Sequence, residues 1–228
     1  MSSRDLILNR LRSVRRPFPD APPRPDTYQQ VIAQDDTRPG ALLERFTREL
    51  TNLRGEVFAV EGADAARQQI VDLLGRQQAT DILAWDFAHI PVPGLGDALT
   101  AAGIRVMVPA VQDEFRAETL AAAGAAQAGL TGADAAAATT GTLIVTSGPG
   151  RGRLPTILPP VHLAVITLDQ IVPGVEQWIA RQRAAGLPGM RASANAAFIS
   201  GPSRTGDIEM ELILGVHGPG IVQVVVIR

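Results

Sequence analysis

The stretch EVFAVEGADAARQQIVDLLGRQQATDILAWD, residues 56–86, decides the fold of this chain. Residues 56–61 and 81–86 are short apolar runs typical of buried strands. Residues 63–77 repeat their apolar side chains at the spacing of an amphipathic helix. A strand, a helix and a strand in this order predict two parallel strands joined by a crossover helix.

The same alternation continues on both sides of this stretch. A helix is predicted before it at 41–53, and a short helix at 94–103 and a third strand at 104–110 are predicted after it. An Ala-rich segment, 117–138, follows, and the later predictions are strands at 142–147, 161–168, 195–201 and 221–228 and a helix at 174–186. The pattern predicts an α/β domain with a mostly parallel central sheet covered by helices on both faces.

The N-terminal segment differs from the rest. Residues 3–15 predict an amphipathic helix, which we expect to pack on the domain or on a second subunit. The sequence PFPDAPPRP at 17–25 excludes regular structure and is typical of a stiff linker. We therefore predict a helix and a Pro-rich linker over 1–39 and one α/β domain over 40–228.

Composition excludes several functional classes. The chain has 228 residues and a net charge of −2, with acidic and basic residues mixed, so nothing favours nucleic acid or an anionic membrane as a partner. No apolar run reaches the length that spans a bilayer, and the N-terminus lacks the apolar core of a signal peptide. We expect a soluble cytoplasmic protein.

Two residue types are absent. Without lysine the chain has no Schiff-base amine and no P-loop lysine. Without cysteine it has no disulfide, no thiol nucleophile and no thiolate ligand for an iron–sulfur cluster. Any cofactor of that kind would have to belong to a partner.

A Gly- and Arg-rich loop follows the strand at 142–147. In SGPGRGR, residues 147–153, glycines allow backbone amides to approach an anion, and arginines add positive charge. The anion-binding candidates are Gly150, Arg151 and Arg153. The alternative is an ordinary crossover loop, since no GK[ST] motif follows.

The segment Thr140-Gly141-Thr142 places hydroxyls and a glycine at the start of an apolar strand. Hydroxyl and backbone donors there could bind a carboxylate or a phosphate. A polar strand start is the equally open alternative.

The segment GPSRTGDIEMELILGVHGPG, residues 201–220, is the third candidate. We predict a helix over 206–214 capped by Thr205, although alternating apolar residues leave a strand open. With the helix, Ser203, Arg204 and Thr205 would lie at a strand-to-helix turn, where Arg204 could clamp an anion with two hydrogen bonds.

The same segment supplies the candidate acid–base groups. Asp207 and Glu209 are candidates for proton transfer or for a helix cap that pairs with Arg204. His217 lies in a flexible turn beside Gly218, which is a further binding candidate. The three histidines lack the spacing of zinc ligands, and we predict no metal site.

Together these segments resemble a known family. LTGADAAAATTGTLIVTS (130–147), LPPVHLAVITLDQIV (158–172) and the segment 201–220 are similar, in order, to the lactate utilization protein C family, which is defined by the LUD domain. The GPSRT-x-DIE and GVHGP motifs are the most specific part of the resemblance. One departure is Thr139, where the family usually has an acid before TGT. If that acid is catalytic in relatives, this chain has altered or lost the step.

The resemblance implies a three-layer α/β/α fold similar to the sugar-phosphate isomerase and CoA-transferase superfamily. It implies a role in oxidising L-lactate to pyruvate with iron–sulfur partner subunits, a small carboxylate as ligand and no cofactor on this chain. The alternatives are a non-catalytic scaffold for those subunits and an independent enzyme acting on a sugar phosphate or a CoA ester. The oligomeric state stays open and includes a homo-oligomer.

Overall fold

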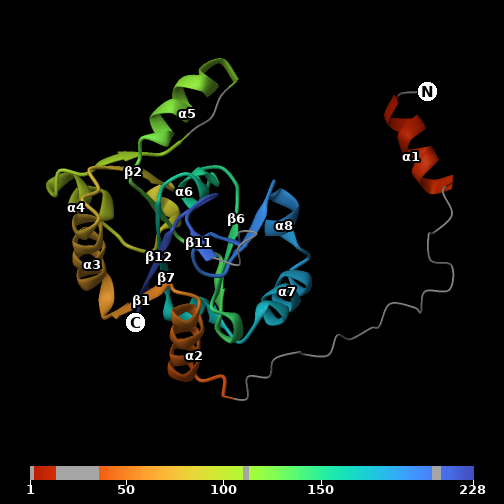
Figure 1. Ribbon diagram of the computed structural model, residues 1–228. Helices are drawn as coiled ribbons and strands as arrows, with labels where there is room; N and C mark the ends of the chain where they lie inside the picture. Colours follow the sequence, from red (N-terminus) through yellow and green to blue (C-terminus); the bar gives the residue numbers. More distant parts are fainter. Residues whose placement is uncertain (1–2, 14–35, 110–112, 207–211) are drawn as a thin grey trace. The chain divides into compact units, whose positions relative to one another are not determined.

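The computed structural model describes residues 3–13, 36–109, 113–206 and 212–228. The chain divides into two compact units, Met1–Val31 and Ile32–Arg228. The first contains helix α1 (Ser3–Ser13), whose Leu6, Ile7 and Leu11 side chains are exposed. The second contains all other described elements (Figure 1).

A six-stranded parallel sheet forms the centre of the second unit (Figure 1). Its strand order is β1-β12-β7-β4-β2-β3. The strands are β1 (Glu56–Val60), β2 (Asp81–Ala84), β3 (Arg105–Met107), β4 (Ala128–Thr131), β7 (Val161–Thr167) and β12 (Ile221–Ile227). The predicted mostly parallel sheet with flanking helices is confirmed.

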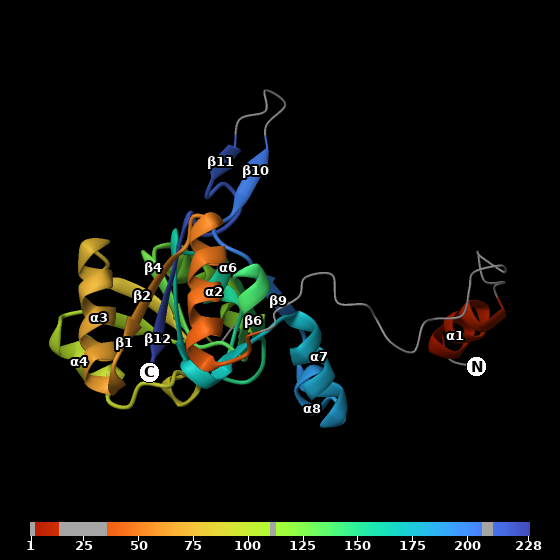
Figure 2. The ribbon, with the colours of Figure 1, turned by 90° about the horizontal axis from the view of Figure 1, so that it is seen from below.

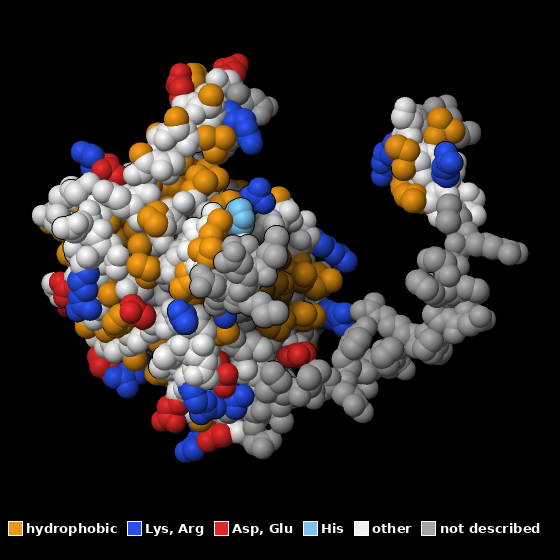
Figure 3. Space-filling view, in the orientation of Figure 1, with side chains coloured by type: hydrophobic (Ala, Val, Ile, Leu, Met, Phe, Trp, Pro, Cys, Tyr) orange, Lys and Arg blue, Asp and Glu red, His pale blue; other side chains and the backbone are white. Residues whose placement is uncertain are grey.

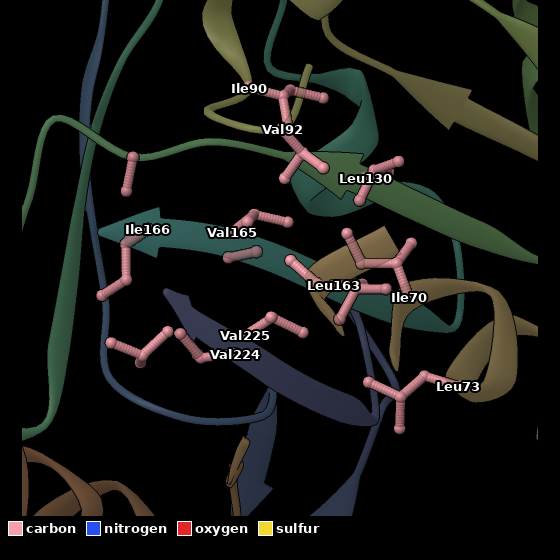
Figure 4. Packing of buried hydrophobic residues seen from close by; sticks show 14 of the residues in the cluster. Ile70, Leu73, Ile90, Val92, Leu130, Leu163, Val165, Ile166, Val224 and Val225 are labelled. Carbon is pink, nitrogen blue, oxygen red and sulfur yellow. The ribbon is translucent and has the colours of Figure 1, made fainter. Parts of the chain in front are cut away.

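Helices cover the two faces of this sheet (Figure 2). On one side lie α3 (Gly62–Arg76) and α4 (Leu95–Ala101), and Figure 4 shows Ile70 of α3 beside Leu163 of β7. On the other side lies α2 (Pro39–Asn52), which buries Leu42, Phe46 and Leu50 along one stripe. Full burial of such a side chain contributes about 2 kcal/mol to folding, so the apolar periodicity of these helices is enough to fix which face packs inward.

A second, four-stranded sheet extends the structure on the side of α2. Its order is β8-β5-β6-β9, and its strands are β5 (Ala135–Ala137), β6 (Thr142–Thr146), β8 (Ile171–Val172) and β9 (Ala196–Ile199). Helix α7 (Val175–Ala184) packs against it, with buried Trp178 next to Ile144 of β6. The other α-helices of the described residues are α5 (Arg116–Gly124), α6 (Leu154–Ile157) and α8 (Pro188–Ala192). Hydrophobic and charged side chains lie side by side on the surface of α5 (Figure 3).

The predicted helix over 206–214 is wrong at its described ends. Arg204–Gly206 is strand β10 and Leu212–Leu214 is strand β11, and the two pair in an antiparallel hairpin that extends from the domain (Figure 2). Alternating apolar residues favour a strand, and glycine at position 206 disfavours a helix. The strand alternative is therefore correct for these residues, while 207–211 lie outside the described ranges.

One histidine is completely buried in the central sheet. His162 of β7 lies with its Nε2 2.9 Å from the hydroxyl oxygen of Thr131 on neighbouring β4, and its Nδ1 has no partner in the described structure. Burial lowers the pKa of His162 to about 4, because the charged imidazolium would lose its hydration. We expect this residue to be neutral in the folded protein at neutral pH.

Among the described helices, none combines the length and the hydropathy that a membrane crossing requires.

Candidate functional site

The TGT segment forms a sharp turn that enters strand β6. Residues Ala138–Thr140 make one turn of 3-10 helix, and Gly141 follows with φ +59°. A Cβ at Gly141 would lie 2.5 Å from the backbone nitrogen of Leu50 in α2, closer than real Cβ atoms approach. Glycine is therefore required here both by the left-handed backbone and by the close approach of α2.

Three hydroxyl groups meet beside this turn. The Thr142 Oγ1 lies 2.7 Å from Thr140 Oγ1 and 2.8 Å from Ser200 Oγ. Strands β6 and β9 are antiparallel and pair Leu143 with Ile199, which places Ser200 next to Thr142. We call Thr140, Thr142 and Ser200 the hydroxyl cluster. Thr142 is buried, whereas Ser200 is exposed, so the cluster runs from the core to the surface.

The GPSRT segment lies at the outer end of the hydroxyl cluster. An Arg204 Nη2 donates a hydrogen bond to the Ser200 carbonyl oxygen at 3.0 Å. The guanidinium is exposed and has no carboxylate partner among the described residues. Within the described ranges its remaining N–H groups make no hydrogen bond. A guanidinium can bind a carboxylate in a bidentate geometry.

The GPSRT and GVHGP motifs contact each other through their backbones. Ser203 donates its amide to the Pro219 carbonyl at 2.8 Å, and Gly215 donates to the Ser203 carbonyl at 2.9 Å. A Cβ at Gly218 would lie 3.4 Å from Cβ of Ser203. The two motifs therefore form one structural unit at the base of the β10–β11 hairpin.

The candidate acid–base residues are not brought into this arrangement by the described contacts. His217 is exposed in the loop after β11, and its ring makes no hydrogen bond within the described ranges. Asp207 and Glu209 lie outside the described residues. Thr205 pairs with Ile213 in the hairpin, so it does not cap a helix as predicted.

The C-terminal half of α2 supports both motifs. Gly141 packs on the backbone of Leu50, and a Cβ at Gly201 would lie 2.7 Å from the Leu53 carbonyl oxygen. On the same helix, Arg45 Nε lies 2.8 Å from a Glu49 carboxylate oxygen. The end of α2 and its capping residue Leu53 thus contact both the TGT turn and the start of the GPSRT segment, which sequence reasoning did not predict.

The Gly- and Arg-rich loop is packed against the ends of β2 and β4. Arg151 forms an ion pair with Asp134, with Nη1 to Oδ1 at 3.0 Å, and lies over the ring of Trp85 with its Cζ 5.9 Å from the ring centroid. The carbonyl of Gly152 accepts from Trp85 Nε1, and that of Gly150 accepts from the Asp86 amide. Asp134 therefore already supplies the anion for Arg151.

The other two candidates in this loop, Arg153 and Gly150, form no ion pair with a described carboxylate. Arg153 is exposed and has no ion-pair partner in the described part of the chain. Gly150, with φ +68°, lets the His89 ring approach, since a Cβ there would lie 3.3 Å from its Nε2. These contacts show a loop held by the protein itself and do not by themselves make an anion site.

Two observations bear on the chemistry available to the hydroxyl cluster. Thr139, where a carboxylate was expected by resemblance, is buried and donates its amide to the Pro173 carbonyl at 3.0 Å. Within the described ranges, no group of three or more His, Asp or Glu side chains could hold a metal ion. The position before the TGT segment therefore holds a buried neutral hydroxyl in place of a carboxylate.

Sequence reasoning did not identify Ser200, Asp134 or Trp85. Ser200 immediately precedes the GPSRT motif, but only the pairing of β6 with β9 shows that it meets Thr142. Asp134 and Trp85 meet Arg151 because β2 and β4 are neighbours in the sheet. Neither the β6–β9 pairing nor the β2–β4 pairing can be read from a local sequence pattern.

Comparison with known proteins identifies the family. The LUD domain model matches residues 43–227, which include the whole central sheet, the hydroxyl cluster and the β10–β11 hairpin.

Two curated relatives share a name. The chain is 33% identical over 157 residues to the lactate utilization protein C of Halalkalibacterium halodurans, covering 68% of this chain and 66% of that protein. It is 40% identical over 103 residues to the protein of the same name from an Exiguobacterium species, covering 45% of each. The chain thus spans about two thirds of the first relative and less than half of the second.

A solved structure supports the fold. The chain resembles the crystal structure of a DUF162 family protein from Deinococcus radiodurans with a TM-score of 0.61 and 22% identity, over 85% of this chain and 100% of that one. At this identity the likeness concerns the fold alone. Because the LUD domain model matches most of its length, the chain belongs to the LUD domain family.

Proposed function

We propose that this protein acts in lactate utilization and binds a small carboxylate, of the 2-hydroxy or 2-oxo acid class, at the hydroxyl cluster and Arg204. The name of the relatives supports the pathway. The convergence of Thr142, Ser200 and Arg204 supports the site, and it is the observation that carries the proposal.

The hydroxyl cluster fits this class of ligand by its chemistry. Each hydroxyl both donates and accepts a hydrogen bond, so the cluster can reorient its protons toward a carboxylate or toward a neutral hydroxyl. Arg204 adds a fixed positive charge at the exposed end. A ligand with a carboxylate beside a hydroxyl or keto oxygen matches both groups.

The same chemistry limits what the chain would do alone. Lactate oxidation removes two electrons, and a chain without cysteine supplies no thiolate for an iron–sulfur acceptor. Thr139 is a poor general base, because a hydroxyl is not ionised near neutral pH. We propose that electron transfer belongs to iron–sulfur partner subunits, and that this chain binds and positions the acid.

Isothermal titration with L-lactate, pyruvate and acetate tests the binding. We expect saturable binding of L-lactate or pyruvate, weakened at least tenfold in Arg204→Gln. The matched control is Arg76→Gln, an exposed arginine in the last turn of α3, which should bind like wild type. Absence of binding to every acid, with and without the partner subunits, would contradict the proposal.

A scaffold subunit is the second candidate, and one observation favours it. Four exposed apolar side chains lie on neighbouring segments, namely the end of α6, the start of β12 and the loop after β11. The Pro160 carbonyl, just after α6, accepts from the Gly220 and Ile221 amides, and a Cβ at Gly218 would lie 4.0 Å from the Ile157 carbonyl oxygen. These side chains are Ile157, Leu158, Val216 and Ile221. Patches of this kind mark surfaces that bind another protein.

Growth on lactate separates the two candidates. If Arg204→Gln leaves lactate-dependent growth intact and Val216→Asp abolishes both growth and co-purification with the iron–sulfur subunits, the scaffold is correct. The opposite pattern supports carboxylate binding. An enzyme acting on a sugar phosphate or CoA ester is not favoured, since Arg151 of the Gly- and Arg-rich loop is already paired with Asp134.

A further inference from the structure

A separate surface cavity of about 360 Å³, open to solvent at Ala88, His89 and Asp169, lies outside the hydroxyl cluster and the Gly- and Arg-rich loop. Its walls are the 3-10 turn that follows β2 (Phe87–His89) and the 3-10 turn that follows β7 (Leu168–Gln170). The lining residues are Ala88, His89, Ile90, Pro91, Thr167, Asp169 and Gln170. This volume falls in the range of small-molecule sites in proteins.

The cavity lies at the carboxyl end of β4. A Cβ at Gly132, just after β4, would lie 2.3 Å from the His89 carbonyl oxygen, so the first wall rests on this strand end. From the second wall, the Gln170 side-chain amide donates to the Ala133 carbonyl at 2.6 Å. Both walls are thus attached to the same short segment.

This position is the topological switch point of the central sheet. The chain leaves β2 toward β3 at one edge, but it leaves β4 toward β7 and β12 on the other side. In open α/β sheets, ligands bind outside the carboxyl ends of the strands where the order reverses in this way. The hydroxyl cluster, by contrast, is built on the second sheet.

The walls are held in place without any ligand. The Gln170 side-chain oxygen accepts from the Thr167 amide at 2.8 Å, and an Asp86 carboxylate oxygen accepts from the Ala88 amide at 2.9 Å. The His89 ring packs against Gly150. A site whose walls are fixed in advance loses little conformational entropy on binding.

Two side chains in the cavity offer hydrogen bonds to a ligand. Asp169 accepts from the Thr167 hydroxyl through Oδ1, and among the described residues it has no cationic partner. Within the described ranges its Oδ2 accepts no hydrogen bond. The His89 ring makes no hydrogen bond within the described ranges and offers one donor and one acceptor when neutral.

From this geometry we propose that the cavity binds a small uncharged polyol or sugar, whose neighbouring hydroxyls donate to Asp169 and exchange hydrogen bonds with His89. Ala88 and Pro91 supply apolar contact for the carbon face of such a ligand. Asp169 repels carboxylates and phosphates, so the cavity differs in specificity from the Arg204 site.

Backbone amide NMR titration of the full-length protein with glycerol, erythritol and D-glucose tests the proposal. We expect saturable shifts of Ala88, His89 and Gln170 with at least one of these probes, and none with acetate. Asp169→Asn should weaken the binding at least tenfold, and Ala88→Phe, which fills the cavity from an exposed position, should abolish it. Asp72→Asn, at an exposed position of α3, is the matched control and should bind like wild type.

The NMR spectrum of each variant reports whether that variant is folded. If Asp169→Asn is unfolded, the test is decided by Ala88→Phe. The proposal is overturned if no polyol gives saturable shifts, if the shifts lie elsewhere, or if Ala88→Phe leaves them unchanged. Saturation by acetate or by 1,4-diaminobutane at the same amides, in place of the polyols, would also overturn it.

Discussion

The hydroxyl oxygens of Thr142 and Ser200 lie 2.8 Å apart, although 58 residues separate them in the chain. This contact joins the TGT turn to the GPSRT segment and gives the candidate site its geometry. Thr142 is buried and Ser200 is exposed, so the pair connects the core of the second sheet to the surface.

Thr142→Val should remove the centre of the hydroxyl cluster while keeping the branched shape. We expect a loss of about 1–2 kcal/mol in the free energy of unfolding, because the Thr140 and Ser200 hydroxyls lose their common partner. Urea denaturation measures it. Thr100→Val, at an exposed position in α4, should change stability by less than about 0.5 kcal/mol. Equal losses in both variants would show that the cluster has no special role.

Gly141→Ala should be strongly destabilising. The residue has φ +59°, and a Cβ would meet the backbone of Leu50 at 2.5 Å, so we expect a loss of about 2–4 kcal/mol. Gly75→Ala is the matched control: nothing lies within 4 Å of its Cβ, and it sits in α3, where alanine should stabilise by about 0.5–1 kcal/mol. The midpoint of thermal denaturation should fall in Gly141→Ala and rise in Gly75→Ala.

His162 should make the protein less stable in mild acid. Its pKa is lowered to about 4 by burial, so between that value and the ordinary value near 6.5 the unfolded chain binds more protons than the folded one. The contribution of neutral His162 to the free energy of unfolding is fully present above about pH 6.5 and is lost as the pH falls to about 4. The whole loss amounts to about 3 kcal/mol.

The measurement for His162 is the free energy of unfolding from pH 4 to pH 7.5. His162→Gln cannot titrate and keeps a hydrogen-bonding group near Thr131, so its stability should depend less on pH in this window. His217→Gln, at an exposed histidine, should keep the wild-type slope. An unchanged slope in His162→Gln would refute the assignment.

The Arg151–Asp134 pair should stabilise the Gly- and Arg-rich loop. Asp134 also accepts from the Thr146 amide at 2.5 Å, and both side chains are largely buried, with 25% of Arg151 and 22% of Asp134 exposed. Asp134→Asn should therefore cost about 1–3 kcal/mol. Glu61→Gln breaks the more exposed pair with Arg228 and should cost less than about 0.5 kcal/mol. Similar costs by urea denaturation would contradict the structural role of Asp134.

Much of the fold could be predicted because apolar periodicity and burial agree. The parallel strands at 81–86 and 161–168 and the helices at 41–53 and 63–77 follow from patterns that burial explains. The strand at 56–61 lies at the sheet edge, where Val57, Phe58 and Val60 are partly buried against the core. Strands β4 and β5 were not predicted, because alanine and glycine give little strand signal. At Gly129 the reason for a small residue is tertiary: a Cβ would lie 1.7 Å from the Pro155 carbonyl oxygen.

The site was harder to predict than the fold. The TGT and GPSRT segments could be selected by residue type and by resemblance, but Ser200 becomes visible only through the β6–β9 pairing. The helix predicted over 206–214 is wrong at its described ends, because β10 and β11 pair in a local antiparallel hairpin that alternating apolar residues and Gly206 favour over a helix. The roles of Arg204, Asp207, Glu209 and His217 stay predictions.

The most direct test of the central claim is a backbone amide NMR titration of the wild-type protein with L-lactate and pyruvate. Carboxylate binding at the hydroxyl cluster predicts saturable shifts at Thr140, Gly141, Ser200 and Arg204, and their loss in Arg204→Gln. Shifts confined to other parts of the domain, or no saturable shift with either acid, would contradict it.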